Sequence, residues 1–241
     1  MGGRNATRKQ MELSFQHPRS GEWAHDRRDP LREARLSFFE PAWEAAAPQP
    51  QQVLRMLEIG FGRGLNTAMA LRMLHQLGHR GGAQAWGCEP NPEVVQPWPQ
   101  VPAELADFAP WWGYTPQDLQ RDGDGVGKWL WSNPAEAQQE VPIRLHALTA
   151  AELLQSLPQG SIDWFFLDLF SPAKHEEDWQ QGLWTGLAKA AAPGAVLTSY
   201  TCARRVRDGL EMVGWQCQVL RRPNYRDTLR ARWLPPDGPS A

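Results

Sequence analysis

Three acidic side chains directly follow or end apolar runs and are candidates for chemistry. Glu58 lies at the end of the run 53–59, Glu89 comes directly after the run 83–88, and Asp168 follows Trp164 to Leu167. If these runs are parallel strands, their carboxyl ends lie at one edge of a sheet, where open α/β folds bind ligands. We therefore expect the three carboxylates to share one site.

A glycine-rich segment surrounds the first of these acids and reads Glu58-Ile-Gly60-Phe-Gly62-Arg-Gly64-Leu-Asn66. Glycines permit a tight turn and a close approach of backbone to ligand. The position after Gly64 is leucine, where a dinucleotide-binding fingerprint would have its third glycine. An acid before the first glycine favours a cationic ligand over a pyrophosphate. The ammonium and sulfonium of S-adenosylmethionine are such cations, and the alternative is a purely structural turn. The residues expected to bind this cofactor here are Glu58, Gly60, Gly62, Gly64 and Asn66.

The other two acids have distinct expected roles. A carboxylate at position 89 can accept both ribose hydroxyls of an adenosine. Asp168 follows apolar residues and is therefore expected to be partly desolvated, where it can hold an amine nucleophile and take up its proton. The alternatives are a solvated acid at position 89 and an ordinary turn-capping aspartate at 168. The chain has no G-x-S-x-G motif, so a serine hydrolase finds no support.

Strands and helices are predicted to alternate along most of the chain. The predicted strands are 53–59, 83–88, 143–148, 162–169, 195–200, 215–220 and 228–233. The predicted helices are 65–77, 149–157 with Thr149 as cap, one from the acids 176–178 to 191, and 203–213. This order predicts an α/β fold of the class I, Rossmann-like methyltransferase type. Its sheet would be seven-stranded and mostly parallel, ending in an antiparallel C-terminal hairpin.

The length of 241 residues suits one α/β domain. We expect residues 1–50 to form an N-terminal extension packed on a methyltransferase domain at 51–234. Residues 97–140 are rich in tryptophan and proline and interrupt the alternation, so we interpret them as an insertion carrying short helices.

The bulk composition gives weaker indications. Three widely spaced cysteines and six histidines without ligand spacing predict no disulfide framework and no metal. With no apolar leader and no apolar run long enough to span a bilayer, a cytoplasmic protein is expected. Eight arginines and three acids lie between Cys202 and Trp233. This basic segment either faces a polyanion or simply solvates the surface.

Several stretches resemble one family. The runs FLDLFSPAKHEEDW, LEIGFGRGLNTAMAL, SGEWAHDRRDPLREARLSFFEPAW and LTSYTCARRVRDGLEMVGW are similar to the methyltransferase part of the bifunctional bacterial enzyme that makes 5-methylaminomethyl-2-thiouridine in tRNA. The similarity covers roughly residues 20–232. It implies methyl transfer from S-adenosylmethionine to the exocyclic amine of 5-aminomethyluridine at the tRNA wobble position. Because the chain ends where the family's FAD-dependent oxidase domain begins, methyl transfer alone is expected.

The resemblance also assigns residues. Asp168 matches the family's active-site aspartate, and the glycine-rich loop and Glu89 match its cofactor loops. Phe170, Pro172 and Lys174 are expected near the substrate. Where the family commonly has Gly-Asp, this chain has Leu148-Thr149, and Thr149 is expected to hydrogen-bond the adenine amino group. The segment RRPNYRDTLRARW also differs from the family's usual glycine-rich and Lys-Arg-Glu pattern.

Three alternative functions remain open from the residues. An aminopropyltransferase of the spermidine-synthase type shares the fold, but the acid-rich surroundings of a polyamine site are missing after Asp168. A nicotinamide oxidoreductase is disfavoured by the G-x-G-x-G spacing and the terminal hairpin. A non-catalytic RNA-binding module would require a vestigial cofactor site, for which Leu148-Thr149 is the one indication.

Overall fold

The fold is described from a computed structural model, which describes residues 13–17, 20–91, 94–95, 126–131 and 141–234. Its strands are β1 Leu54–Ile59, β2 Ala83–Cys88, β3 Val126–Trp131, β4 Val141–His146, β5 Ile162–Leu167, β6 Ala191–Ser199, β7 Trp215–Leu220 and β8 Thr228–Trp233. Its helices are α2 Pro30–Glu33, the π-helix η1 Ala34–Phe39, α3 Glu40–Ala46, α4 Leu65–Gln76, α6 Ala150–Ser156, the 3₁₀ turn η4 Glu176–Asp178, α7 Gln181–Ala190 and α8 Arg204–Met212.

In the described part of the chain these strands form one eight-stranded sheet in the order β3-β4-β2-β1-β5-β6-β8-β7. The neighbours from β4 to β6 pair in parallel, whereas β8 pairs antiparallel with both β6 and β7. This confirms the predicted class I arrangement of seven strands with an antiparallel terminal hairpin. The eighth strand, β3, pairs antiparallel with β4 at the edge of the sheet.

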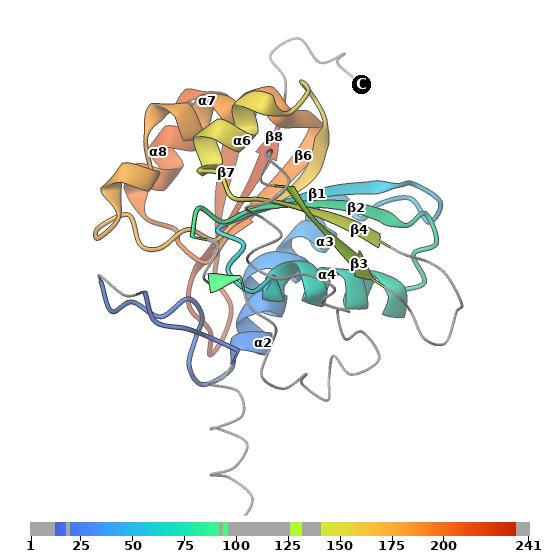
Figure 1. Cartoon of the computed structure of the whole chain (residues 1–241), viewed down its shortest axis with the longest axis horizontal. Helices are drawn as coiled ribbons and strands as arrows, with labels where there is room; N and C mark the ends of the chain where they lie inside the picture. Colours follow the sequence, from blue (N-terminus) through green and yellow to red (C-terminus); the bar gives the residue numbers. More distant parts are fainter. Residues whose placement is uncertain (1–12, 18–19, 92–93, 96–125, 132–140, 235–241) are drawn as a thin grey trace, which may run out of the picture.

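Helices cover both faces of the sheet (Figure 1). One face carries α6, α7 and α8, and the other carries α4, η1 and α3. Successive strand residues point to opposite faces, and β5 shows this clearly. Phe165 and Leu167 join the hydrophobic cluster under α6 to α8, whereas Trp164 and Phe166 join the cluster under α4 and η1. With apolar residues on both sides, β5 is the buried central strand that its sequence predicts.

Several predicted bounds differ from the structure by a few residues, as for β4, which lies at Val141–His146 and not at 143–148, and two elements differ more strongly. The acids 176–178 form the separate turn η4, and α7 begins only at Gln181. β6 begins at Ala191 and not at residue 195, because the register against β5 shifts between the pairs Ile162–Ala191 and Trp164–Val196. Gly194, with φ +78°, lies in this irregularity and supplies a backbone conformation that other residues rarely adopt. The expected turn is therefore an irregularity inside the strand.

The N-terminal residues follow the sheet's carboxyl edge, at the left in Figure 1, before α2 begins. Asp29 caps α2 by accepting a hydrogen bond from the Arg32 N–H at 3.0 Å, and Pro30 starts the helix. η1 then packs against α4 and β6. The chain thus reaches β1 only after it has contributed a segment to the edge where ligands are expected.

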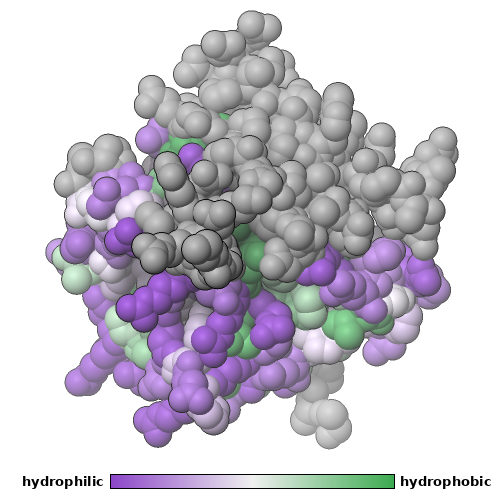
Figure 2. Space-filling model, turned by 90° about the horizontal axis from the view of Figure 1, so that it is seen from below, coloured by the Kyte–Doolittle hydropathy of each residue, from purple (hydrophilic) through white to green (hydrophobic). Residues whose placement is uncertain are grey.

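Most of the predicted insertion at 97–140 lies outside the described residues. Its described part, residues 126–131, is the strand β3, where short helices were expected. Among the described residues no helix is long and apolar enough to cross a membrane. The described surface seen from below in Figure 2 is mostly hydrophilic, and hydrophobic residues show only in small areas of it.

Candidate active site

A cavity of about 640 Å³ opens at the carboxyl edge of the sheet. Its walls come from the glycine-rich loop after β1, the residues after β2 and β5, the start of α6, and the N-terminal segment. This volume lies in the range typical of small-molecule sites, and a carboxyl edge is where open α/β sheets bind ligands. The cavity is therefore the candidate active site.

The glycine-rich loop forms one wall. Gly60, Gly62 and Gly64 have φ of +78°, +51° and +71°, which is the left-handed region. A Cβ on Gly60 would lie 2.5 Å from the carbonyl oxygen of Asp168, so only glycine permits this approach of β1 and β5. Gly60 and Gly62 line the cavity, whereas Gly64 precedes α4 as its N-cap.

Glu89 lines the cavity on the other side of this loop. Its Oε2 accepts a hydrogen bond from the Gly62 N–H at 3.0 Å, and its Oε1 accepts one from the Asn91 N–H at 3.0 Å. Burial raises the pKa of Glu89 to about 7, against the lowering effect of these two backbone donors. Each oxygen retains acceptor capacity for a hydroxyl group.

Glu58 has a different place from Glu89. Its side chain is buried and accepts hydrogen bonds from the Thr67 N–H at 3.0 Å, the Thr67 hydroxyl at 2.6 Å and the Asn66 amide at 2.9 Å. It is not among the described residues that line the cavity. Glu58 was expected to bind the cofactor, but this geometry favours a role in organising the loop and the first turn of α4. Burial raises its pKa to about 7.

Asp168 lies directly after β5 and lines the cavity. Its backbone N–H donates to Ile59 at 2.8 Å, which fixes it beside the end of β1. Its Oδ2 accepts a hydrogen bond of 2.7 Å from Asn66. The Asn66 amide therefore bridges the buried acids Glu58 and Asp168. Burial raises the pKa of Asp168 to about 7, and the nearby His25 opposes that rise.

Several lining residues near Asp168 are not among the predicted cofactor or catalytic residues, and they include His25, Glu33, Tyr200 and Arg226. Nδ1 of His25 lies 3.7 Å from Oδ2 of Asp168 and 3.6 Å from Oε2 of Glu33. Arg226 forms an ion pair of 2.6 Å with Glu33 and lies over the ring of Tyr200. His25 lies in a stretch that resembles the family, and this resemblance is the one feature of the sequence that could have marked it as a site residue. A single sequence does not show that His25 lies beside Asp168.

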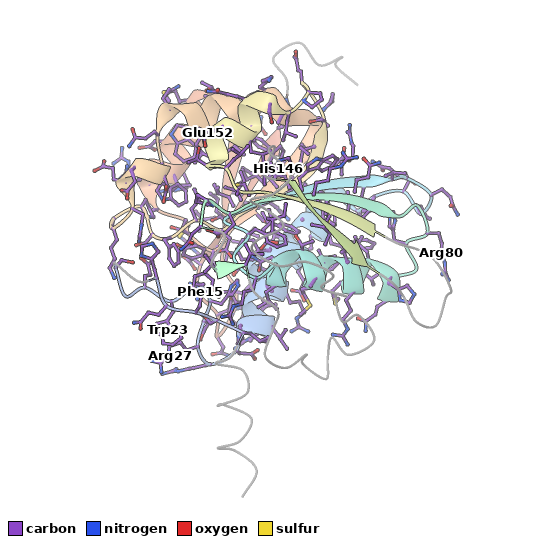
Figure 3. All side chains as sticks on the ribbon, in the orientation of Figure 1. Phe15, Trp23, Arg27, Arg80, His146 and Glu152 are labelled. Atoms are coloured by element: carbon purple, nitrogen blue, oxygen red, sulfur yellow. The ribbon has the colours of Figure 1, made fainter. Side chains whose placement is uncertain are left out.

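The predicted substrate residues separate into two groups. Phe170 lines the cavity and contacts the rings of Phe15 and His17, at centroid distances of 6.2 and 4.8 Å. In Figure 3 Phe15 lies nearer the body of the molecule than Trp23, which is farther out on the same N-terminal segment. Pro172 and Lys174 are not among the described lining residues, and Lys174 is exposed.

Leu148 and Thr149, which replace the family's usual Gly-Asp, also lie in different surroundings. Leu148 packs against the hydrophobic cluster under α6, whereas Thr149 lines the cavity. Thr149 is confirmed as the cap of α6, in a capping box with Glu152 (labelled in Figure 3). Its hydroxyl donates to Oε2 of Glu152 at 2.7 Å. A hydrogen bond to adenine would therefore use the hydroxyl's remaining acceptor capacity or replace this contact.

Arginines of the basic C-terminal segment have acidic neighbours. Arg204 pairs with Asp208, Arg205 with Glu176, Arg221 with Asp227, and Arg222 with Glu44. The side chains of Arg204 and Arg221 are 86% and 84% exposed, whereas Arg222 is 18% exposed. Arg204 and Arg221 are therefore the most exposed of these four cations, followed by Arg205 at 41%.

Comparison with known proteins agrees with this geometry. A family model described as S-adenosyl-L-methionine-dependent methyltransferase matches residues 129–232. The tRNA 5-methylaminomethyl-2-thiouridine biosynthesis bifunctional protein MnmC of Acidovorax sp. (strain JS42) is 27% identical over 92% of this chain and 35% of its own length. The same-named protein of Pseudomonas fluorescens (strain Pf0-1) is 33% identical over 66% of this chain and 23% of its own length. The chain thus spans about a third or less of these relatives.

A solved structure has the same fold. MNMC2 from Aquifex aeolicus superposes with a TM-score of 0.70 at 21% identity, over 93% of this chain and 69% of the other. The chain is thus similar, over residues 129–232, to the S-adenosyl-L-methionine-dependent methyltransferase family model, and over most of its length to the methyltransferase-containing MnmC relatives.

Proposed function

We propose that the chain transfers a methyl group from S-adenosylmethionine to the exocyclic amine of a 5-aminomethyluridine-type wobble base in tRNA. The observation that carries the proposal is the buried carboxylate of Asp168, which lines the same cavity as the glycine-rich loop. The names of the MnmC relatives support tRNA as the substrate. The proposal includes a cytoplasmic location and an extension at 1–50 that completes the site of a domain at 51–234.

The residues present fit the cofactor. Gly60 and Gly62 bring backbone to the cavity wall without side chains, and Glu89 presents two carboxylate oxygens for the ribose hydroxyls. S-adenosylmethionine supplies a methyl group already activated by the sulfonium. The task of the protein is therefore to align the acceptor nitrogen with that methyl group, which can supply a large part of the rate enhancement.

Asp168 would prepare the acceptor. The substrate amine arrives as an ammonium, which cannot attack because its nitrogen has no free electron pair. The ammonium N–H bond breaks, the proton passes to a carboxylate oxygen of Asp168, and the nitrogen regains its electron pair. Asn66 and His25 both approach Oδ2, so among the described contacts Oδ1 is the oxygen left to face the amine.

The surroundings favour an amine acceptor in general. Acids that line the cavity besides Asp168 and Glu89 are Glu22, Asp26, Glu33, Glu177 and Asp178. The acid-rich surroundings that the residues directly after Asp168 lack are thus supplied by the N-terminal segment, α2 and η4, so a polyamine is the alternative acceptor to test. For the wobble base itself, an anticodon loop lets the base leave its stack and enter a pocket.

The test is incubation of the protein with labelled S-adenosylmethionine and bulk tRNA that lacks wobble methylation, followed by nucleoside mass spectrometry. We expect label in 5-methylaminomethyluridine-type nucleosides. Putrescine is the control acceptor, offered with S-adenosylmethionine and, separately, with its decarboxylated form. Label in the polyamine alone would refute the tRNA assignment and favour a small-amine transferase.

A further inference from the structure

The N-terminal segment holds one histidine rigidly at the substrate end of the cavity. His25 is 8% exposed. Its backbone N–H donates to the Ser14 hydroxyl at 3.0 Å, and that hydroxyl lies 3.2 Å from the His25 carbonyl. The adjacent Ala24 N–H donates to the Phe15 carbonyl at 2.9 Å. These contacts fix the backbone that carries the imidazole.

The imidazole faces two carboxylates with the same nitrogen. Nδ1 is 3.7 Å from Asp168 Oδ2 and 3.6 Å from Glu33 Oε2, and it is buried without a hydrogen-bond partner among the described residues. A buried donor with no partner is costly. A protonated Nδ1 between two carboxylates recovers that cost by electrostatic attraction, so the arrangement favours the imidazolium.

The charged groups around His25 and Asp168 come from several elements. Glu33 is on α2, Glu58 on β1 and Asp168 after β5, and all three act on His25. Arg226, between β7 and β8, pairs with Glu33 and partly neutralises it. The other polar groups against Asp168 are Asn66 of α4 and Tyr200 after β6. Among these described groups, His25 and Arg226 are the cations.

We propose that His25 is a positioning residue of the methyl transfer, whose imidazolium holds Asp168 as the carboxylate that receives the substrate's proton. This role rests on the proposed function. In the proton step, the ammonium loses one proton to Asp168 while His25 keeps its own. After transfer the nitrogen carries the positive charge as a secondary ammonium, and Asp168 releases its proton to water before the next cycle.

The direction of the effect follows from the charges. Burial lowers the pKa of His25, but contact with Glu33 and the negative charges of Asp168 and Glu58 outweigh this, so the pKa is raised. Conversely, burial raises the pKa of Asp168, and the charge of His25 limits that rise. Removal of the imidazolium therefore leaves Asp168 protonated over a wider pH range.

The first test compares His25→Gln with the wild type and with the matched control His75→Gln, on the far part of α4. An opposite charge at this distance shifts a pKa by about one unit or more. We expect the acidic limb of the kcat profile to move up by about one unit in His25→Gln. Turnover of the variant at pH 7 should then be about fivefold below that of the wild type, and at pH 9 the two should be about equal. The KM for S-adenosylmethionine should be unchanged.

Two outcomes of this test would overturn the role. One is an unchanged midpoint of the acidic limb, and the other is a loss of turnover that is equal at every pH, which indicates structural support only. If the wild type methylates no tRNA under any condition, the proposed function fails, which is a result distinct from either of these.

A second measurement needs no activity and no folded His25 variant. Nitrogen-15 NMR of the wild-type imidazole reports the protonation of both ring nitrogens. We expect the midpoint of His25 to lie above the ordinary imidazole value of 6.5, and to fall in Asp168→Asn. A neutral ring at pH 6.5, or a midpoint that Asp168→Asn leaves in place, would refute the coupling.

Discussion

The backbone N–H of Gly62 donates a hydrogen bond of 3.0 Å to Oε2 of Glu89, which joins two cofactor motifs from different parts of the chain. Gly62 lies in the loop after β1, and Glu89 lies directly after β2. Because β1 and β2 are parallel neighbours, their following residues meet at the same edge. The bond orients the carboxylate before any ligand arrives, so a change at either residue should affect cofactor binding.

Glu89→Gln should weaken S-adenosylmethionine binding by about tenfold or more, because hydrogen bonds to a charged group contribute about 1.5–3 kcal/mol. The raised pKa of Glu89, about 7, adds a pH dependence. Below pH 7 the wild-type carboxyl is protonated, so affinity should fall between pH 8 and pH 6. Calorimetry at these pH values measures both effects. The matched control is Glu211→Gln on α8, and equal, pH-independent affinity in folded Glu89→Gln would remove the ribose assignment.

Gly60→Ala and Gly78→Ala form a matched pair for the loop. Their φ values are +78° and +77°, so alanine suffers similar backbone strain, about 1–2 kcal/mol, at both. A Cβ at Gly78 meets nothing within 4 Å, whereas one at Gly60 meets the Asp168 carbonyl at 2.5 Å. We therefore expect Gly60→Ala to lose more unfolding free energy in urea and also to lose cofactor binding. Equal losses would mean that β5 can move aside.

The fold can be predicted from local patterns, because each strand of the parallel core is a short apolar run ending in a polar or glycine residue. The side-chain chemistry of Thr149 alone predicts it as a cap. β3 is not predicted, since nothing in its tryptophan-rich stretch distinguishes an edge strand from a helix. The sequence places the beginning of β6 too late because Pro193-Gly194 is typical of a turn, and pairing with β5 overrides that local preference.

The candidate site can be predicted only in part, because some of its contacts join segments that are far apart in the sequence. Asp168 and Glu89 are marked by their positions at strand ends. His25 contacts Asp168 through the path of the N-terminal segment, which no spacing in one sequence reports. Arg226 belongs to the basic segment that is expected either to face a polyanion or to solvate the surface. Its guanidinium pairs with Glu33 at the cavity, a contact between distant segments that no spacing in one sequence reports.

RNA binding should depend on the exposed arginines and not on the buried one. Arg204 and Arg221 follow β6 and β7 at the carboxyl edge, and their exposed ion pairs add little stability. Replacing both with alanine should lower the slope of log K against log salt by about 0.7–0.9 for each phosphate that the protein no longer neutralises. Arg222→Ala, whose side chain is mostly buried against Glu44, is the control and should keep the slope. An unchanged slope in the double variant would mean that this segment only solvates the surface.

Asp168→Asn should separate chemistry from cofactor binding. The amide keeps the shape of the side chain but loses the charge that attracts an ammonium and the site that accepts its proton. General-base contributions are about 10²–10⁴ in rate, so turnover at pH 7 should fall at least about a hundredfold. Binding of S-adenosylmethionine should stay within a few-fold of wild type, because Glu89 and the glycine-rich loop remain intact.

The pH profile makes the Asp168 assignment sharper. Because burial raises the pKa of Asp168 to about 7, wild-type turnover should decline as pH falls below 7, where the carboxyl is protonated. Asp168→Asn has no such group, so its profile should lack that limb, and its deficit should shrink at high pH, where more of the substrate amine is already neutral. Single-turnover rates from pH 6 to pH 9 measure this, with Asp208→Asn on α8 as the matched control. Near-normal turnover of the Asp168→Asn variant at pH 7 would refute the catalytic role, whereas loss of cofactor binding alone would assign Asp168 to cofactor positioning.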